Sequence, residues 1–470
     1  MASKTKKLGL VSLALCIGLS LNINVNAATP HKKSNFFRYN GGISKTDILL
    51  RKKLRFHDVK SVEKPAPQDP AMVELGQSLF FDKELSGRRN IDCETCHSPF
   101  LGSADGQSQS RAQGAIGLGP SRRQNGDERF DFLPRNALSL WNRGVPGWDV
   151  MFWDGRLSGN AQEGFISPAG DDTPQNFTNA LGAFSAFPIT PDEEMRGFPG
   201  QLDVFGQPNE LGDLTDEDFV EIWDLITARI VNNEGYDELL DAAFPGVEQK
   251  DLDIADLSNA MGAFMTEAFT ALDSPFDRYL AGDNSAMSDS AKRGALLFYG
   301  RANCAACHSG GLQTDFEFHN IAAPQVGTGR GDAAPLDLGR GAITGNPSEN
   351  FQFRTPSLRN IELEGPYMHN GAFDELEDAI RHHLDPFTSL ATYDASQIEF
   401  ELAGIFQNDP QTLETILSTL DPELVVYGRP LNDNEIKDLM SFMSALTDPA
   451  SLNLFEIIPT SVASGLPLAD

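Results

Sequence analysis

The chain has 470 residues, of which 40% are hydrophobic and 22% are charged, and this ordinary globular composition excludes a disordered or fibrous protein. Acidic residues outnumber basic ones 67 to 37, so the net charge is -30, which excludes nucleic-acid binding through phosphate neutralisation. Such acidity is typical of a soluble secreted protein, and it would also attract a small basic partner.

An export signal is predicted over residues 1–28. Three lysines between positions 4 and 7 precede an apolar stretch from Leu8 to Leu21, and Val25-Asn26-Ala27 supplies the small residues of a cleavage site. The apolar stretch is too short to span a bilayer, and no other stretch is long and apolar enough. We therefore expect a periplasmic protein without a membrane span. Residues 29–67 form an N-terminal extension to which the sequence gives no role.

Four cysteines remain after export, and they form Cys93-Glu94-Thr95-Cys96-His97 and Cys304-Ala305-Ala306-Cys307-His308. Cys-x-x-Cys-His is the attachment signal of c-type haem, in which both thiols become thioethers and the histidine ligates the iron. Two disulfides or one four-cysteine zinc site would not explain a histidine after both pairs in a chain with only eight. The sequence therefore predicts two covalently bound haems c, haem 1 on the first motif and haem 2 on the second.

The segments around the two motifs look like copies of one unit. Gly76-Gln77-Ser78-Leu79-Phe80 precedes the first motif as Gly294-Ala295-Leu296-Leu297-Phe298 precedes the second. Behind the motifs, Ser139-Leu140-Trp141-Asn142 parallels Ser357-Leu358-Arg359-Asn360, and Phe152-Trp153-Asp154-Gly155 parallels Met368-His369-Asn370-Gly371. Four matches in the same order indicate a duplication.

The predicted fold is mainly α, with two cytochrome-c-like haem domains in tandem and long irregular loops. The first haem domain spans residues 68–280 and contains a helical insert, the second spans 281–450, and 451–470 is a C-terminal tail without a predicted role. Amphipathic helices are predicted over Thr215–Val231 and Asp253–Leu272. Residues 273–290, rich in Ser, Asp and Gly, are the expected domain junction.

The group above each iron decides what each haem does. No histidine lies between His97 and His308, so the loop after the first motif cannot supply a histidine ligand to haem 1. Unless Met151, Met195 or a distant residue closes that site, haem 1 has an open face where peroxide can bind. An open haem is typical of catalysis and a closed one of electron transfer.

For haem 2 a candidate ligand lies on a predicted helix over residues 374–384. Apolar side chains at positions 376, 379 and 380 share one helix face with His383, while His382 points about 100° away. His383 is therefore a candidate second ligand. The alternative is a histidine that is hydrogen-bonded in the core or at the surface.

These residues together resemble the bacterial di-haem cytochrome c peroxidase superfamily, which includes the MauG-type enzymes. The resemblance covers roughly residues 69 to 447. Besides the two haem motifs, it is carried by Leu75-Gly76-Gln77-Ser78-Leu79-Phe80-Phe81-Asp82 with Leu85-Ser86, Phe152-Trp153-Asp154-Gly155-Arg156, Ser274-Pro275-Phe276-Asp277-Arg278, Pro356-Ser357-Leu358-Arg359-Asn360 and Gly365-Pro366-Tyr367-Met368-His369-Asn370-Gly371.

The resemblance implies that haem 1 is the peroxide site and haem 2 the electron-transfer site. It matches Trp153 to a tryptophan between the haems, for which a plain core tryptophan is the alternative. Gln162 and Pro168 resemble the distal-pocket glutamine and proline. Glu194 resembles the acid that moves a proton between the peroxide oxygens. The chain between residues 168 and 194 is longer than the usual pattern, so Glu193 and Glu163 remain alternatives.

The family also implies one calcium ion between the haems. Asn142 matches its side-chain ligand, and Glu364 and Pro366 match the two backbone carbonyl positions. Oxygen ligands from loops are those that calcium prefers.

Two departures from the family pattern matter. Peroxidases of the family have a histidine in the loop after haem 1 that must leave before peroxide binds; this chain lacks it, as MauG-type enzymes do. The second departure lies fourteen residues after His369, where the family has a methionine or tyrosine ligand to haem 2 and this chain has His383. A bis-histidine haem is expected to have a lower potential than a His/Met haem.

The leading hypothesis is a peroxidase that reduces hydrogen peroxide at haem 1 with electrons that enter through haem 2 from a small c-type cytochrome. A second is a MauG-like enzyme that oxidises side chains of a partner protein through a high-valent di-haem state. A third is an electron-transfer or sensor cytochrome without turnover, which requires a closed haem 1. The sequence names neither the donor nor a protein substrate, and it leaves open a homodimer.

Overall fold

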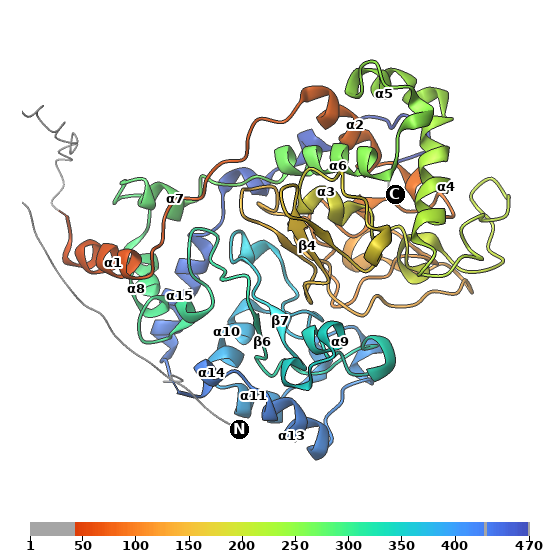
Figure 1. Ribbon diagram of the computed structural model, residues 1–470. Coiled ribbons are helices and arrows are strands. Elements are labelled where there is room, and N and C mark those ends of the chain that lie inside the picture. Colours follow the sequence, from red (N-terminus) through yellow and green to blue (C-terminus); the bar gives the residue numbers. More distant parts are fainter. Residues whose placement is uncertain (1–42, 427–429, 469–470) are drawn as a thin grey trace, which may run out of the picture. The chain divides into compact units, whose positions relative to one another are not determined.

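The computed structural model describes residues 43–426 and 430–468. It is mainly helical, with little sheet, as predicted (Figure 1). The helices are α1 Lys45–Phe56, α2 Pro70–Phe80, α3 Ala180–Ser185, α4 Phe219–Val231, α5 Asp237–Ala243, α6 Ile254–Ala268, α7 Pro275–Leu280, α8 Asp289–Phe298, α9 Arg340–Thr344, α10 Leu376–Leu384, α11 Pro386–Ala391, α12 Phe400–Ala403, α13 Pro410–Ser418, α14 Pro422–Val426 and α15 Asp433–Ser444. The predicted export signal lies outside the described residues.

The strands are short and pair only with neighbours in three antiparallel sheets. They are β1 Ala115–Ile116 with β2 Arg123–Gln124, β3 Val150–Met151 with β4 Leu157–Asn160 and β5 Gly164–Ile166, and β6 Phe318–His319 with β7 Phe353–Arg354. Most of the remaining chain is loop, so the haem-binding segments are positioned by helix pairs and by loop hydrogen bonds. In the described ranges, no helix is both long and apolar enough to cross a membrane.

Two equivalent helix pairs build the two halves of the chain. Helix α2 packs on α6, and α8 packs on α15. A Cβ placed on Gly76 of α2 would lie 1.9 Å from the carbonyl oxygen of Ala260, and one on Gly294 of α8 would lie 1.9 Å from that of Asp438. Glycine inside a helix costs about 1 kcal/mol, so these two positions are explained by close helix contact. The matching glycines support the duplication that the sequence indicates.

Aromatic clusters fill both helix crossings. Phe80 packs on Phe264 in the first half, and Phe298 packs on Phe442 in the second, with ring centroids 5.3 and 5.2 Å apart. All four rings are buried in the two largest hydrophobic clusters. The two predicted amphipathic helices correspond to α4 and α6, and α6 is the second helix of the first pair.

The two terminal segments each pack on the half of the chain that lies farther away in sequence. Helix α1 buries Leu50 and Leu54 against the cluster that contains α8 (Figure 1). The C-terminal tail instead bonds to the first half, where the amide of Ala463 donates to Ser78 Oγ and Gln77 donates to the carbonyl of Ile457. These contacts give both segments the packing role that the sequence does not reveal.

Candidate haem-binding and peroxide site

The two haem motifs adopt the same local structure. Each begins with a 3₁₀ turn, Cys93–Thr95 or Cys304–Ala306, and the amide of the following histidine donates to the carbonyl of the first cysteine over 2.9 Å. The Nδ1 atom of His97 lies 3.1 Å from the carbonyl oxygen of Ser103, and that of His308 lies 3.2 Å from the carbonyl of Gln313. A carbonyl only accepts, so Nδ1 carries the proton and Nε2 keeps its lone pair for a metal.

Burial keeps both histidines in the form that binds metal. Desolvation lowers the pKa of His97 and of His308 to about 4, so each ring is neutral near pH 7. All four cysteines are free of disulfide bonds, as thioether formation to haem requires. The two motifs therefore present the predicted attachment groups and one imidazole nitrogen each.

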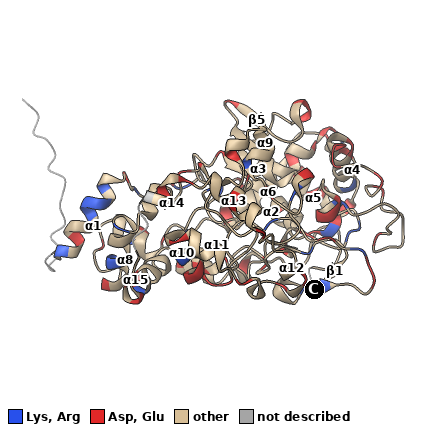
Figure 2. Cartoon of the chain, turned by 90° about the horizontal axis from the view of Figure 1, so that it is seen from below, with Lys and Arg blue, Asp and Glu red and all other residues tan. Residues whose placement is uncertain are grey.

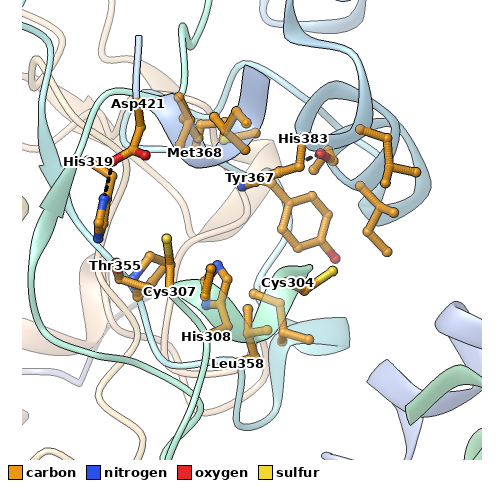
Figure 3. A pocket seen from close by; sticks show the side chains of 18 of the residues that line it. Cys304, Cys307, His308, His319, Thr355, Leu358, Tyr367, Met368, His383 and Asp421 are labelled. Atoms are coloured by element: carbon orange, nitrogen blue, oxygen red, sulfur yellow. Dashed lines mark hydrogen bonds and ion pairs between the residues drawn. The ribbon is translucent and has the colours of Figure 1, made fainter. Parts of the chain in front are cut away.

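A cavity lies on the second motif, and His383 faces His308 across it (Figure 3). The other lining residues include Cys304, Cys307 and the apolar side chains Leu358, Leu376, Ala379 and Ile380. The ring centroids of His308 and His383 are 6.3 Å apart. Metal–imidazole bonds are about 2 Å long, so two rings on opposite sides of one metal ion have centroids roughly 6 Å apart. This spacing is the one that a haem iron between the two rings requires.

The neighbouring histidine of α10 is engaged elsewhere. In His382, Nδ1 lies 2.9 Å from Ser389 Oγ and Nε2 lies 2.8 Å from the carbonyl of Ile321, so neither nitrogen is free. In His383, Nδ1 lies 2.7 Å from the carbonyl of Ala379, which leaves Nε2 available. The face that the sequence predicts for His383 is therefore the face that lines the cavity.

A larger cavity, of about 790 Å³, lies on the first motif. It is lined by Cys96 and His97 together with charged residues from several loops: Arg135, Arg156, Glu193, Glu194, Asp216 and Arg330. A smaller cavity on the same motif is lined by Cys93, Met195, Met261 and Met265, whereas Met151 is buried in the core away from both. Among the residues that the structure describes, His97 is the only histidine that lines either cavity.

Glu194 lies in the wall of both cavities, on a π-helical turn formed by Asp192–Arg196. Single π turns inside proteins are frequently found at functional sites. The pKa of Glu194 is raised to about 8, mainly by burial and also by the charge of the neighbouring Glu193, although Arg156 and Arg330 oppose the rise. A carboxyl group with such a pKa can both accept and release a proton near neutral pH. Glu193 lines the larger cavity too, whereas Glu163 is exposed and lies in neither wall.

Gln162 and Pro168 are not brought to the cavities. Gln162 is exposed in the turn between β4 and β5, and Pro168 is exposed just after β5. Phe184 and Pro188 line both cavities in their place. The β4–β5 hairpin and α3 make up the extra length between Arg156 and Glu194, which shifted the sequence match by about twenty residues. The proximity of Pro188 to Glu194 in the chain was the signal that could have identified it.

Trp153 lies where the cavities of the two halves meet. It lines the cavity of the second motif, the larger cavity of the first motif and a third cavity of about 50 Å³. Its indole Nε1 donates to the carbonyl of Asn136 over 3.1 Å, and its own carbonyl accepts from the amide of Arg354 over 2.7 Å. The indole is thereby held in one orientation between the two motifs.

The residues predicted to bind calcium do not come together. The side chain of Asn142 is engaged with Ala271: Oδ1 accepts from its amide over 2.8 Å and Nδ2 donates to its carbonyl over 3.2 Å. Glu364 and Pro366 line the third cavity, but Asn142 does not. Asn136 does line it, and its Oδ1 makes no hydrogen bond with the described residues.

A guanidinium group also reaches this third cavity. Arg143 lines it beside Glu364, and both Nη1 of Arg143 and Oε1 of Glu364 are buried without a hydrogen-bond partner in the described residues. The predicted ligand set therefore does not fit calcium, and a buried cation is already supplied by the chain.

Sequence reasoning missed a second cluster of charged residues at haem 2. The Nδ1 atom of His319 lies 2.5 Å from the carboxylate of Asp421 (Figure 3). Its Nε2 atom lies 3.0 Å from the carboxylate of Asp315. The Asp315 hydrogen bond leads the effects that raise the pKa of His319 to about 11, so its ring is a cation. Cys307, Asp315 and His319 are near enough to hold a metal ion, but Cys307 belongs to the haem motif. The cluster is therefore part of the haem 2 surroundings.

Comparison with known proteins agrees with this geometry. The family model for di-haem cytochrome c peroxidase matches residues 70–285. The methylamine utilization protein MauG of Methylorubrum extorquens is 31% identical over 387 residues, which cover 81% of this chain and 88% of that protein. The cytochrome c551 peroxidase of Pseudomonas aeruginosa is 29% identical over 313 residues, covering 65% of this chain and 70% of that one.

The fold has a counterpart among solved structures. A MauG-like protein associated with microbial copper homeostasis superposes with a TM-score of 0.59 at 22% identity, covering 85% of this chain and 97% of the other. Relatives of both kinds, peroxidases and MauG proteins, match at nearly the same level of identity. On its identity to MauG over most of its length, the chain belongs to the di-haem cytochrome c peroxidase and MauG family of oxidoreductases.

Proposed function

We propose that the protein is a periplasmic peroxidase that reduces hydrogen peroxide at the haem 1 site with electrons that enter at the haem 2 site. One peroxide, two electrons and two protons give two waters, so two molecules of a one-electron donor are oxidised per turnover. The observation that carries this proposal is an asymmetry. His383 faces His308 across the second cavity. In the two cavities on the first motif, Glu194 lines the walls, and His97 has no second histidine of the described chain beside it.

The chain supplies attachment and ligation at both sites. Cys93 and Cys96 would hold haem 1, with His97 as its ligand, and the equivalent residues of the second motif would hold haem 2. When bound, the haems supply redox chemistry at an open site and electron transfer at a site with two histidine ligands. His383 would be the second ligand of haem 2, because its Nδ1 is the nitrogen bonded to Ala379 and its ring lies 6.3 Å from that of His308.

Glu194 would move the proton that peroxide cleavage requires. Its carboxylate accepts the proton from the inner peroxide oxygen and delivers it to the outer one, which leaves as water. Arg156 and Arg330 line the same cavity and attract the carboxylate, and a cation at this place also favours the anionic form of the peroxide. Phe184 and Pro188 form the apolar part of the wall and limit the water that reaches the acid.

Trp153 would connect the two sites. It is the residue that the cavities of both motifs share, and its indole is fixed by the hydrogen bond to Asn136. An aromatic ring between two redox centres shortens each step that an electron must travel. This role rests on position, and it does not require the indole to bind peroxide.

A MauG-like role is the second candidate function. It is favoured by the absence of a histidine other than His97 from the described walls of both haem 1 cavities, so no ligand of that type has to leave before peroxide binds. In that role a partner protein whose side chains are oxidised in the reaction, rather than a reduced cytochrome, would be the second substrate. His383 at the second site argues against close equivalence, because MauG-type members carry a tyrosine there.

The test is peroxide turnover by the purified holoprotein with a ferrocytochrome c as the donor. We expect two cytochromes oxidised per peroxide from the fully oxidised starting enzyme, without prior reduction. Cytochrome oxidation by peroxide that is no faster with the enzyme than without it would contradict the peroxidase. An oxidised enzyme that persists for minutes with the ferrocytochrome present would favour the MauG-like role.

A further inference from the structure

One surface of this acidic chain is basic. Helix α1 carries five basic residues, Lys45, Arg51, Lys52, Lys53 and Arg55, and one acidic residue, although the whole chain has a net charge of -30. In Figure 2 the basic residues appear as blue segments of the α1 ribbon. Lys45, Lys52, Lys53 and Arg55 are exposed and form no ion pair with the residues that the structure describes.

Apolar side chains stand among these cations. Ile48, Leu49 and Phe56 are 57%, 55% and 81% exposed, although an apolar residue on a helix of a soluble domain usually faces the core. The core-facing positions of α1 are already filled by Leu50 and Leu54, which pack on the second half of the chain. The outer face of α1 is defined here by these three apolar residues and the four exposed basic residues named above. None of the seven is needed to pack α1 on the rest of the chain.

The chain holds α1 rigidly in place. Arg51 Nη2 donates to Asn284 Oδ1 over 2.6 Å, and Lys292 Nζ lies 3.0 Å from Asp47 Oδ1 in a buried ion pair. Ser44 and Asp47 form a capping box at the start of the helix. A surface fixed by such contacts loses little conformational entropy when a partner binds.

The segment that follows α1 contacts the segment that follows the haem 2 motif. The hydroxyl of Ser309, the residue after His308, donates to the carbonyl of His57 over 3.3 Å. A Cβ placed on Gly311 would lie 2.8 Å from the carbonyl of Lys60, so the two segments are in close backbone contact. Exposed Phe56 is thus separated from the predicted iron ligand His308 by His57 and Ser309 alone.

We propose that the outer face of α1 is the docking surface for an acidic electron-donor protein that delivers electrons to haem 2. The proposal rests on the proposed peroxidase function and names its partner by charge. Each donor molecule loses one electron, and two of them supply the pair that reduces one peroxide to water. An apolar centre with a charged rim is the composition of small, transient interfaces, and complementary charge raises the rate of encounter.

An anionic lipid surface is the other possible occupant, and the structure favours the donor. The apolar face that a membrane-bound helix would insert, with Leu50 and Leu54, is buried on the protein. The rest of the chain is strongly acidic and is repelled by anionic lipids. The contact between the segment that follows α1 and the segment after His308 would bring a bound donor close to haem 2, whereas membrane binding does not require this contact.

The experiment reverses two charges on the outer face. The holoenzyme with Lys52→Glu and Lys53→Glu is compared with wild type and with a control that carries Arg123→Glu and Lys250→Glu, two exposed residues of the first half. Peroxide-dependent oxidation is measured with an acidic ferrocytochrome c and, separately, with hydroquinone. At low ionic strength we expect the α1 variant to raise KM for the acidic cytochrome by about tenfold, with the difference shrinking at high salt. The control and the hydroquinone rates should not change.

Three results would overturn the docking proposal while leaving the peroxidase intact. They are an unchanged KM in the α1 variant, an equal rise in the control, and a wild-type enzyme that uses a basic ferrocytochrome c better than an acidic one. Binding of wild type, but not of the α1 variant, to phosphatidylglycerol vesicles with unchanged cytochrome KM would assign the surface to lipid instead. A wild-type enzyme that reduces peroxide with neither the cytochrome nor hydroquinone contradicts the peroxidase and the docking proposal together.

Discussion

The imidazole rings of His308 and His383 face each other across one cavity with their centroids 6.3 Å apart, and each Nδ1 atom is hydrogen-bonded to a backbone carbonyl. These hydrogen bonds fix the tautomer, so both Nε2 atoms keep a lone pair for a metal ion, and both residues line the same cavity. At the first motif no second histidine of the described chain lines the cavities. The difference between the two sites is the basis of the functional assignment.

Replacing His383 should change the spin state of one haem only. In His383→Gly the low-spin ferric signal should convert to high spin, because one of two strong nitrogen ligands is lost. His382→Gln is the matched control, since both nitrogens of His382 are engaged with Ser389 and Ile321. Electron paramagnetic resonance of the oxidised proteins measures the result. A low-spin signal that survives in His383→Gly but not in His382→Gln would mean that His382, not His383, is the second ligand of haem 2.

Removal of the Glu194 carboxyl should slow the reaction with peroxide by about a hundredfold, with both haems retained. Burial raises the pKa of Glu194 to about 8, so the carboxylate that accepts a proton becomes more populated as the pH rises towards 8. The wild-type rate should therefore increase with pH over this range, and Glu194→Gln should lose that dependence. Stopped-flow mixing with peroxide at several pH values checks it. Glu193→Gln is the control, and a larger loss there would make Glu193 the acid.

A buried ion pair joins the loop after the first motif to the second half of the chain. Arg135 Nε and Nη2 lie 2.7 and 2.9 Å from the carboxylate of Asp337, and Nη1 lies 2.5 Å from Asp154 Oδ2. Arg135→Ala should lower the free energy of unfolding by about 3 kcal/mol, because the buried carboxylate of Asp337 loses its cation and Asp154 keeps only its pairing with Arg156. Chemical denaturation at pH 7 measures this, and Arg123→Ala, an exposed residue, should change little.

The contribution of Arg135 to the free energy of unfolding should decrease at low pH. Burial opposes ionisation of Asp337, but pairing with Arg135 outweighs it and lowers the pKa from 3.8 to about 2. A lowered carboxyl pKa stabilises the fold fully above the unfolded value and is lost as the pH falls through the folded one. The difference between wild type and Arg135→Ala should thus shrink between pH 4 and pH 2. A difference that is constant with pH would mean that Asp337 is not the partner that matters.

Chelation of calcium should leave peroxide reduction and the haem spectra unchanged. The side chain of Asn142 is engaged with Ala271, and the guanidinium of Arg143 lines the cavity where Glu364 and Pro366 lie. Activity is measured after exhaustive dialysis against a chelator and again after calcium is added back. A loss that added calcium restores would contradict this prediction and would point to Asn136, whose Oδ1 atom is unengaged in the same cavity.

The sequence predicts those parts of the site that depend on local spacing. Cys-x-x-Cys-His places two thiols and an imidazole within one turn, and the helical period places His383 on the cavity face of α10. The glycines at 76 and 294 mark helix contacts in both halves, and each is followed by a phenylalanine four residues later. These features require no knowledge of distant residues.

The remaining parts depend on tertiary structure. Gln162 and Pro168 are exposed because a hairpin and α3 extend the chain before Glu194, and a sequence match cannot tell where extra length is inserted. The sequence predicts Asn142 as a calcium ligand, but in the fold both polar atoms of its side chain are hydrogen-bonded to the backbone of Ala271. The pairing of Arg135 with Asp337 and of α1 with α8 joins residues more than 200 positions apart, for which the sequence carries no local signal.

The most direct test of the account is the electron paramagnetic resonance spectrum of the fully oxidised holoprotein, recorded before and after hydrogen peroxide is added without a reductant. We predict one high-spin haem and one low-spin haem with two nitrogen ligands, and rapid loss of the high-spin signal on peroxide addition. Two low-spin haems that do not respond to peroxide would mean that haem 1 is closed, and would contradict the open peroxide site on which the proposed function depends.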